Sequence, residues 1–300
     1  MELLQVDGDT TNRWFASLTL QTKSKIMLSV PGNHDFWLFG NPTMGRKKDQ
    51  FGVGYLQWYM QDTASTLRFP RNGELFNFTN HPGKKASIWP WRHNENVPTV
   101  DNFFSYYTIG NIGFIGYSAH HSWKHTQPYL EDACMFLAEE KRAGGLEVVF
   151  LMGHWNRCDS GCADADGHDM DAHSVHARLM ASGPGIMPAC NHLGNTVPVK
   201  YLAGHTHCNK ILEPDVGFML AGQGMAGSCG NFGIPVLDTT GNRMKLLYYP
   251  LVEPDDKGNS TKQDERTEAI LSCFGNGDMG RCEHLAERWL DQPLPAGGEL

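Results

Sequence analysis

Four short polar clusters, each led by glycine and each following an apolar run, constrain the fold of this 300-residue chain more than any other feature. They are Gly8-Asp9, Gly32-Asn33-His34-Asp35, Gly153-His154 and Gly204-His205-Thr206-His207. The preceding runs (Leu3–Val6, Ile26–Val30, Leu146–Met152, Val199–Ala203) are typical of buried strands. Open α/β sheets place ligand sites at the carboxyl ends of their strands, so we expect the clusters to meet at one rim. A glycine before each polar residue lets the backbone turn sharply and lets a ligand come close.

The segments between these runs predict further helices and strands. We expect helices at Asn12–Lys25, Tyr55–Ser65, Glu131–Arg142 and Ala172–Ala181, a hairpin at Phe103–Ser118 around Gly110-Asn111, and β structure over Gly217–Leu251. At the C-terminus, the charged segment Asp255–Glu268 predicts a solvated linker. Cys282–Leu290 has the apolar spacing of an amphipathic helix.

The polar clusters combine imidazole, carboxylate and amide groups, which suit Mn²⁺, Fe or Zn²⁺ better than Ca²⁺ or Mg²⁺. Two such metals at roughly 3.5–4 Å can hold a bridging hydroxide as the nucleophile for attack on a phosphate ester. The pattern therefore favours hydrolysis of phosphate esters at a dinuclear metal centre.

The order of motifs GD, GNHD, GH and GHxH resembles the calcineurin-like metallophosphoesterase superfamily, from about Gly8 to Leu251. The resemblance implies an α/β (α+β) fold, a two-sheet β-sandwich flanked by helices, with two divalent metals at its edge. It implies that Asp9 bridges both metals, that Asn33, His154 and His205 complete the second metal, and that His207 binds the first. His34 would stand near the leaving group as proton donor or transition-state stabiliser, and Asp35 would hold its ring. An exposed histidine without a catalytic role is the alternative for His34.

The chain departs from this family at its first motif, an Asp-x-His on the strand before the GD loop. Met1–Gly8 contains no histidine, and Asp7 can replace at most one of the two missing ligands. We expect that the sequence starts at an internal methionine and that the first strand, with any signal peptide, lies upstream. The compartment stays open between secreted and cytoplasmic.

The leading functional hypothesis is a phosphomonoesterase or phosphodiesterase acting on a small phosphorylated substrate. Residues 1–252 would form the metallophosphoesterase domain, 36–100 a lid-like insertion that sets substrate choice, and 253–300 a linker and amphipathic tail. One alternative is a catalytically impaired member of the fold that acts as a binding scaffold, which the missing Asp-x-His favours. Another is a hydrolase with one metal.

Composition narrows the partners. A net charge of −8 and a pI near 5.9 argue against nucleic-acid binding, which needs a basic surface. No apolar run approaches the ~20 residues of a membrane span. Oligomeric state stays undetermined.

A small disulfide ring could be closed by Cys158 with Cys162, or by Cys273 with Cys282, and free thiols are equally compatible with the sequence. Asn77-Phe-Thr and Asn259-Ser-Thr match the glycosylation sequon, as a chain of this composition would by chance.

Several other side chains have both a functional and a structural interpretation. His120 and His121 are either substrate contacts or solvated loop residues, Trp37 and Trp155 either line the pocket or pack ordinarily, and Cys208 is by default a small buried residue. Asn12 is expected to cap the following helix. A third metal site is also conceivable in one polar segment, although histidines three apart are common on helix surfaces. Its candidates are His168, Asp169, Asp171, His173 and His176.

Overall fold

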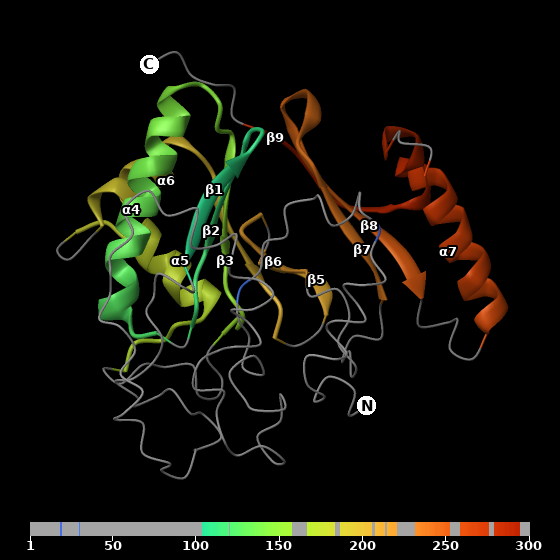
Figure 1. The fold of residues 1–300 in the computed structure, drawn as a ribbon, viewed down its shortest axis with the longest axis horizontal. Helices are drawn as coiled ribbons and strands as arrows, with labels where there is room; N and C mark the ends of the chain where they lie inside the picture. Colours follow the sequence, from blue (N-terminus) through green and yellow to red (C-terminus); the bar gives the residue numbers. More distant parts are fainter. Residues whose placement is uncertain are drawn as a thin grey trace, which may run out of the picture.

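The computed structural model describes Thr19, Val30 and residues 104–119, 121–157, 167–183, 187–205, 208–213, 215–220, 232–252, 259–275 and 279–294. In this part of the chain the fold is mixed α/β, with two sheets and several helices (Figure 1). The elements predicted at Leu3–Val6, Asn12–Lys25, Ile26–Val30 and Tyr55–Ser65, and the lid-like insertion, lie outside the described residues, apart from Thr19 and Val30.

The larger sheet of the described part has six strands in the order β1-β2-β3-β4-β6-β5. The strands are β1 (Ser105–Ile109), β2 (Ile112–Gly116), β3 (Val148–Met152), β4 (Val199–Ala203), β5 (Asn209–Glu213) and β6 (Gly217–Leu220). β2, β3, β4 and β6 run parallel, while β1 and β5 pair antiparallel at the two sides. β1 and β2 form the predicted hairpin, and Gly110 in its turn has a φ of 58°, which favours glycine. The strands predicted before His154 and His205 are confirmed as β3 and β4.

Three helices cover one face of this sheet (Figure 1). They are α4 (Trp123–Arg142), α5 (Ala172–Met180) and α6 (Pro188–Thr196). α5 matches the prediction, but α4 begins eight residues before the predicted Glu131. Burial of Tyr129 and Leu130 stabilises the early turns of α4, although Pro128 lies inside this part of the helix.

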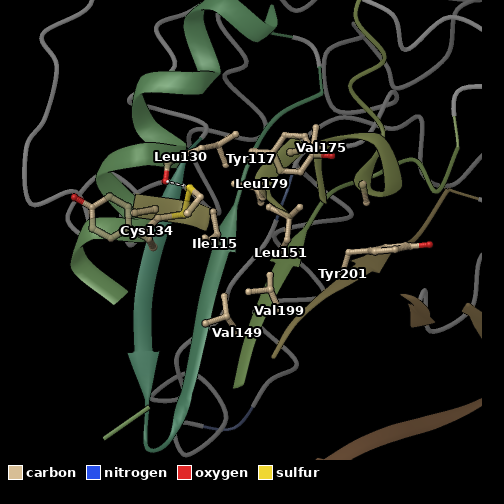
Figure 2. Packing of buried hydrophobic residues seen from close by; sticks show 14 of the residues in the cluster. Ile115, Tyr117, Leu130, Cys134, Val149, Leu151, Val175, Leu179, Val199 and Tyr201 are labelled. Carbon is tan, nitrogen blue, oxygen red and sulfur yellow. Dashed lines mark hydrogen bonds between the residues drawn. A yellow bond between two sulfur atoms is a disulfide. The ribbon is translucent and has the colours of Figure 1, made fainter. Parts of the chain in front are cut away.

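The core between the helices and the larger sheet is closely packed. Ile115, Leu151 and Val199 project from three adjacent strands toward Leu130 of α4 and Val175 of α5 (Figure 2). Each is at most 9 % exposed. Because the neighbouring residues on β3 point to the opposite face and are buried too, β3 reads as an unbroken apolar run, as buried parallel strands do.

The second sheet packs on that opposite face. Its antiparallel strands are β7 (Phe232–Asp238), β8 (Arg243–Val252) and β9 (Glu287–Pro293), and the 3₁₀ turn η5 (Thr240–Asn242) joins the first two. Phe150 and Phe218 of the larger sheet form one buried cluster with Met244 and Leu246 of β8. α7 (Ser260–Gly275) and the 3₁₀ helix η7 (Met279–Leu285) cover the outer face of β8. The described layers are therefore helices, sheet, sheet and helix.

The C-terminal predictions were wrong in two places. Residues 260–268 of the segment predicted as a solvated linker belong to α7, because Ile270, Cys273 and Phe274 farther along this helix share one face and pack against Tyr249. Residues 282–290, predicted as a helix, end η7 and continue into β9. Pairing with β8 outweighs the helical spacing here, since a bulge lets both Trp289 and Leu290 contact the inter-sheet cluster.

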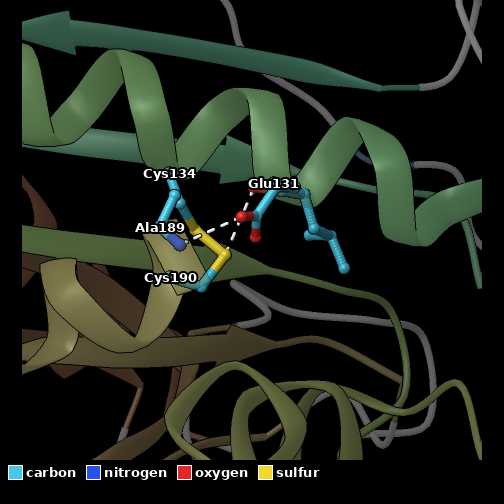
Figure 3. Close-up of a disulfide and its surroundings, with 5 residues drawn as sticks. Glu131, Cys134, Ala189 and Cys190 are labelled. Carbon is cyan, nitrogen blue, oxygen red and sulfur yellow. Dashed lines mark hydrogen bonds between the residues drawn. A yellow bond between two sulfur atoms is a disulfide. The ribbon is translucent and has the colours of Figure 1, made fainter. Parts of the chain in front are cut away.

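Two disulfides join pairs of described cysteines. Cys134 of α4 is bonded to Cys190 of α6, and Glu131 accepts a hydrogen bond from the backbone of Ala189 at 3.0 Å beside it (Figure 3). Cys273 is bonded to Cys282. Of the two states that the sequence left open for this pair, a disulfide or free thiols, the structure has the disulfide. Cys158 and Cys162 lie outside the described residues.

Candidate metal centre

The site begins where β3 and β4 end side by side. Met152 and Leu202 are paired in the parallel register, and the next residues of each strand lead into the predicted ligands His154 and His205. The two loops are joined through one acceptor: the carbonyl oxygen of His154 receives hydrogen bonds from the backbone nitrogens of Gly204 and His205, both at 2.9 Å. This bridging fixes the relative positions of the two histidines.

Their imidazoles meet directly. Nε2 of His154 and Nδ1 of His205 are 3.0 Å apart, and the ring planes are inclined by 77°. In the absence of a cation, this distance is an N–H···N hydrogen bond with one ring as donor. The same distance also fits shared ligation, because two nitrogens ~2.1 Å from one cation and at right angles around it lie ~3.0 Å apart. The two imidazole nitrogens therefore suit a divalent transition metal as ligands.

Trp155 forms the wall behind the two histidines. It is 1 % exposed, and its ring centroid lies 4.7 Å from that of His154 and 5.5 Å from that of His205. The interpretation of Trp155 as a packed core residue is confirmed, and its ring also borders the histidine pair. Burial on this side excludes water from one face of the imidazoles and restricts their rotation.

Gly153, just before the predicted ligand His154, has a packing role that the sequence did not reveal. A Cβ atom added there would lie 2.5 Å from the hydroxyl oxygen of Tyr117. Tyr117 is fully buried, and its hydroxyl donates to the carbonyl of Met170 at 3.0 Å. Burial, followed by the nearby Asp171 carboxylate, raises the pKa of the Tyr117 phenol, so this donor stays protonated.

The remaining members of the predicted set lie outside the described residues: Asp9, Asn33, His34, Asp35 and His207, together with Trp37 and His120. Within the described ranges, no group of three or more His, Cys, Asp or Glu side chains is arranged to hold a metal ion. The structure thus brings together two of the five predicted metal ligands.

The segment considered for a third metal site is used for other purposes. Asp171 caps α5 by accepting a hydrogen bond from the Ser174 nitrogen at 2.8 Å, and His176 Nε2 contacts the Val199 carbonyl oxygen at 2.8 Å. Burial lowers the pKa of His176, so its neutral form with Nε2 as donor is favoured. Asp169 uses its backbone carbonyl to accept from Arg178. Within the described residues, Asp171 and His176 of this segment are therefore engaged in capping and backbone contacts.

An acidic contact beside the site was missed in the sequence. Glu213, the last residue of β5, receives Arg157 Nη2 at 2.7 Å and His173 Nε2 at 3.2 Å on one carboxylate oxygen. These three residues lie on separate elements, and no local pattern marks them as partners. The contact links the loop after His154 to α5 and β5.

The structure bears on two further residues that the sequence singled out. His121 is 4 % exposed, so it is not a solvated loop histidine. Cys208 is buried as expected, but it is disulfide-bonded, which rules out a free thiol nucleophile there.

An apolar cavity of about 220 Å³ lies between the two sheets, and neither His154 nor His205 lines it. Its lining comes from strands of both sheets and contains no ionisable side chain: Ile112, Phe114, Phe150, Leu202, Phe218, Leu237 and Leu246. It therefore offers no groups for hydrolytic chemistry.

Comparisons of the chain with protein-family models, with curated proteins and with solved structures found no match. Among the described helices, none has the length and apolar character needed to cross a membrane.

Proposed function

We propose that this chain is a metal-dependent phosphoric-ester hydrolase of the calcineurin-like metallophosphoesterase kind. The observation that carries the proposal is the 3.0 Å approach of His154 Nε2 and His205 Nδ1 at the ends of neighbouring parallel strands. Two ligands expected to share the second metal, 51 residues apart in sequence, lie at one rim with a separation suited to a single cation. Asp9 and Asn33 would complete that set, and His207 would serve the first metal.

A contact at the neighbouring strand also supports the proposal. A Cβ atom added at Gly116, the last residue of β2, would lie 3.2 Å from Cγ1 of Val30. Gly116 pairs with Met152 of β3, two residues before His154. Val30 precedes Asn33 by three residues, a length of chain that spans at most ~11 Å. This is compatible with Asn33 as a ligand of the same metal.

The residues of the chain would divide the chemistry as follows. When bound, two divalent metals supply a nucleophile derived from water and neutralise the phosphate oxygens. His154 and His205 hold their metal as neutral imidazoles, and Trp155 restrains both rings. His34 protonates or stabilises the leaving group, with Asp35 orienting its ring. The substrate class is a small phosphomonoester or phosphodiester.

Hydrolysis of p-nitrophenyl phosphate and of its bis-ester with Mn²⁺ tests the proposal. We expect turnover by the native chain and a loss of at least about 100-fold in His154→Ala and His205→Ala, since metal ligands are removed. His192→Ala is the matched control, because this histidine is exposed on α6. It should keep full activity.

The outcomes also separate the rival functions. Metal bound in the native chain without turnover of either ester would favour the binding scaffold. Turnover with one metal per chain, lost in Asn33→Ala, would favour the hydrolase with one metal. Equal turnover in the native chain and in both histidine variants would overturn the proposal.

A further inference from the structure

Asn259 starts one of the two sequons of the chain, Asn259-Ser260-Thr261, and the structure places it at the surface. All three residues are exposed; Asn259 immediately precedes α7, and Ser260 and Thr261 are the first two residues of that helix. A transferase that modifies asparagine needs an accessible amide with a hydroxyl residue two positions later, and this site meets both requirements. The other sequon, at Asn77, lies outside the described residues.

The hydrogen bonding of Asn259 leaves the reactive atom available. Oδ1 accepts a hydrogen bond from the backbone nitrogen of Lys262 at 3.2 Å, which caps the first turn of α7. This is the side-chain hydrogen bond that Asn259 makes within the described part of the chain, and it uses the oxygen alone. A substituent on Nδ2 therefore leaves the helix cap in place.

The oxidised cysteines supply independent information about the compartment. Cys134–Cys190 and Cys273–Cys282 are disulfides, Cys208 is disulfide-bonded as well, and Cys273 lies on the same helix as the sequon. Such bonds form in oxidising compartments and are rare in the cytosol. In a eukaryotic cell, the compartment that forms them also transfers oligosaccharides to asparagine.

We propose that Asn259 is an N-glycosylation site. The donor is an oligosaccharide linked through pyrophosphate to a lipid. Nδ2 of Asn259 forms a bond to the anomeric carbon of the sugar and loses one proton, while the bond from that carbon to the pyrophosphate oxygen breaks and the lipid pyrophosphate leaves. The Thr261 hydroxyl completes the recognition sequence, and Oδ1 goes on capping α7.

The test is secretion of the full chain from a eukaryotic host behind a host leader, in the native form and as Asn77→Gln. Peptides containing residue 259 are analysed by mass spectrometry before and after an amidase that removes N-linked glycans and leaves aspartate. We expect a glycan on this peptide and its conversion to aspartate at 259. Asn259→Gln and Thr261→Ala should each lose this one glycan, whereas Ser260→Ala keeps the sequon and should retain it.

The result for the native chain does not depend on any variant, because the mass of the peptide shows directly whether residue 259 carries a glycan. Chain that has entered the secretory compartment and formed the Cys273–Cys282 disulfide, but carries unmodified Asn259, would overturn the proposal. Retention of the glycan in Thr261→Ala would equally contradict the recognition assigned to the sequon.

Discussion

Gly153 and Tyr117 approach so closely that the space for a β-carbon at residue 153 is already occupied by the phenol, at 2.5 Å from the added atom. The glycine before the predicted ligand His154 is thus required by packing against a buried ring. The hydroxyl of that ring is bound to Met170, so the ring cannot withdraw without losing a hydrogen bond.

Gly153→Ala should therefore destabilise the protein. We expect a loss of about 1–3 kcal/mol, the range for forcing an extra carbon into a well-packed core. Urea unfolding measures it. Gly275→Ala is the control, because a β-carbon there meets nothing within 4 Å. A Gly153→Ala variant as stable as the native chain would show that Tyr117 is not held in this position.

The two disulfides should contribute unequally to stability. Cys134 and Cys190 are 56 residues apart and Cys273 and Cys282 are 9 apart. Since the longer loop restricts the unfolded chain more, the chain-entropy estimate is roughly 4 kcal/mol for the first pair and roughly 2.5 kcal/mol for the second. Paired Cys→Ala variants, compared by denaturant unfolding, test this order. A larger loss on removing the Cys273–Cys282 pair would contradict it.

Stability should fall in weak acid because of His176. Burial lowers the pKa of this imidazole from its ordinary value of 6.5, so it is neutral in both states above that pH. Below pH 6.5 His176 becomes protonated in the unfolded chain, whereas in the folded chain it stays neutral until the pH reaches its lower pKa. The free energy of unfolding therefore decreases as the pH falls through that window.

His176→Gln tests this pH dependence. Glutamine can donate to the Val199 carbonyl but does not titrate, so the loss of stability below pH 6.5 should become shallower. His192→Gln, at an exposed position of α6, should leave the slope unchanged. An identical slope in the native chain and His176→Gln would count against the assignment.

Strands and helices fixed by local patterns were predictable from the sequence. β3 is apolar on both faces because helices cover one side and a second sheet the other, so its sequence carries an unbroken signal. β4 is buried in the same way, and its signal is interrupted only by Lys200. The hairpin follows from the positive φ that Gly110 accepts in the turn. These strands place His154 and His205 together, and these are two of the five predicted ligands.

Features that depend on distant partners were not predictable. β9 has helical spacing, but the cross-strand ion pair of Arg243 with Asp291 at 2.6 Å and the stacking of Trp289 on Tyr248 favour the strand. The Cys134–Cys190 bond joins two helices that only the βα crossovers bring together. Glu213 gains its partners Arg157 and His173 in the same way.

Calorimetric titration with Mn²⁺ and Zn²⁺ measures whether the imidazoles of His154 and His205 bind one cation. We expect the native chain and His192→Ala to bind metal equally. His154→Ala and His205→Ala should each lose at least about 10-fold in affinity for the same site, and the double variant should lose little more than either, since both ligands serve one ion. Undiminished metal affinity in both single variants would show that His154 and His205 do not bind a shared cation.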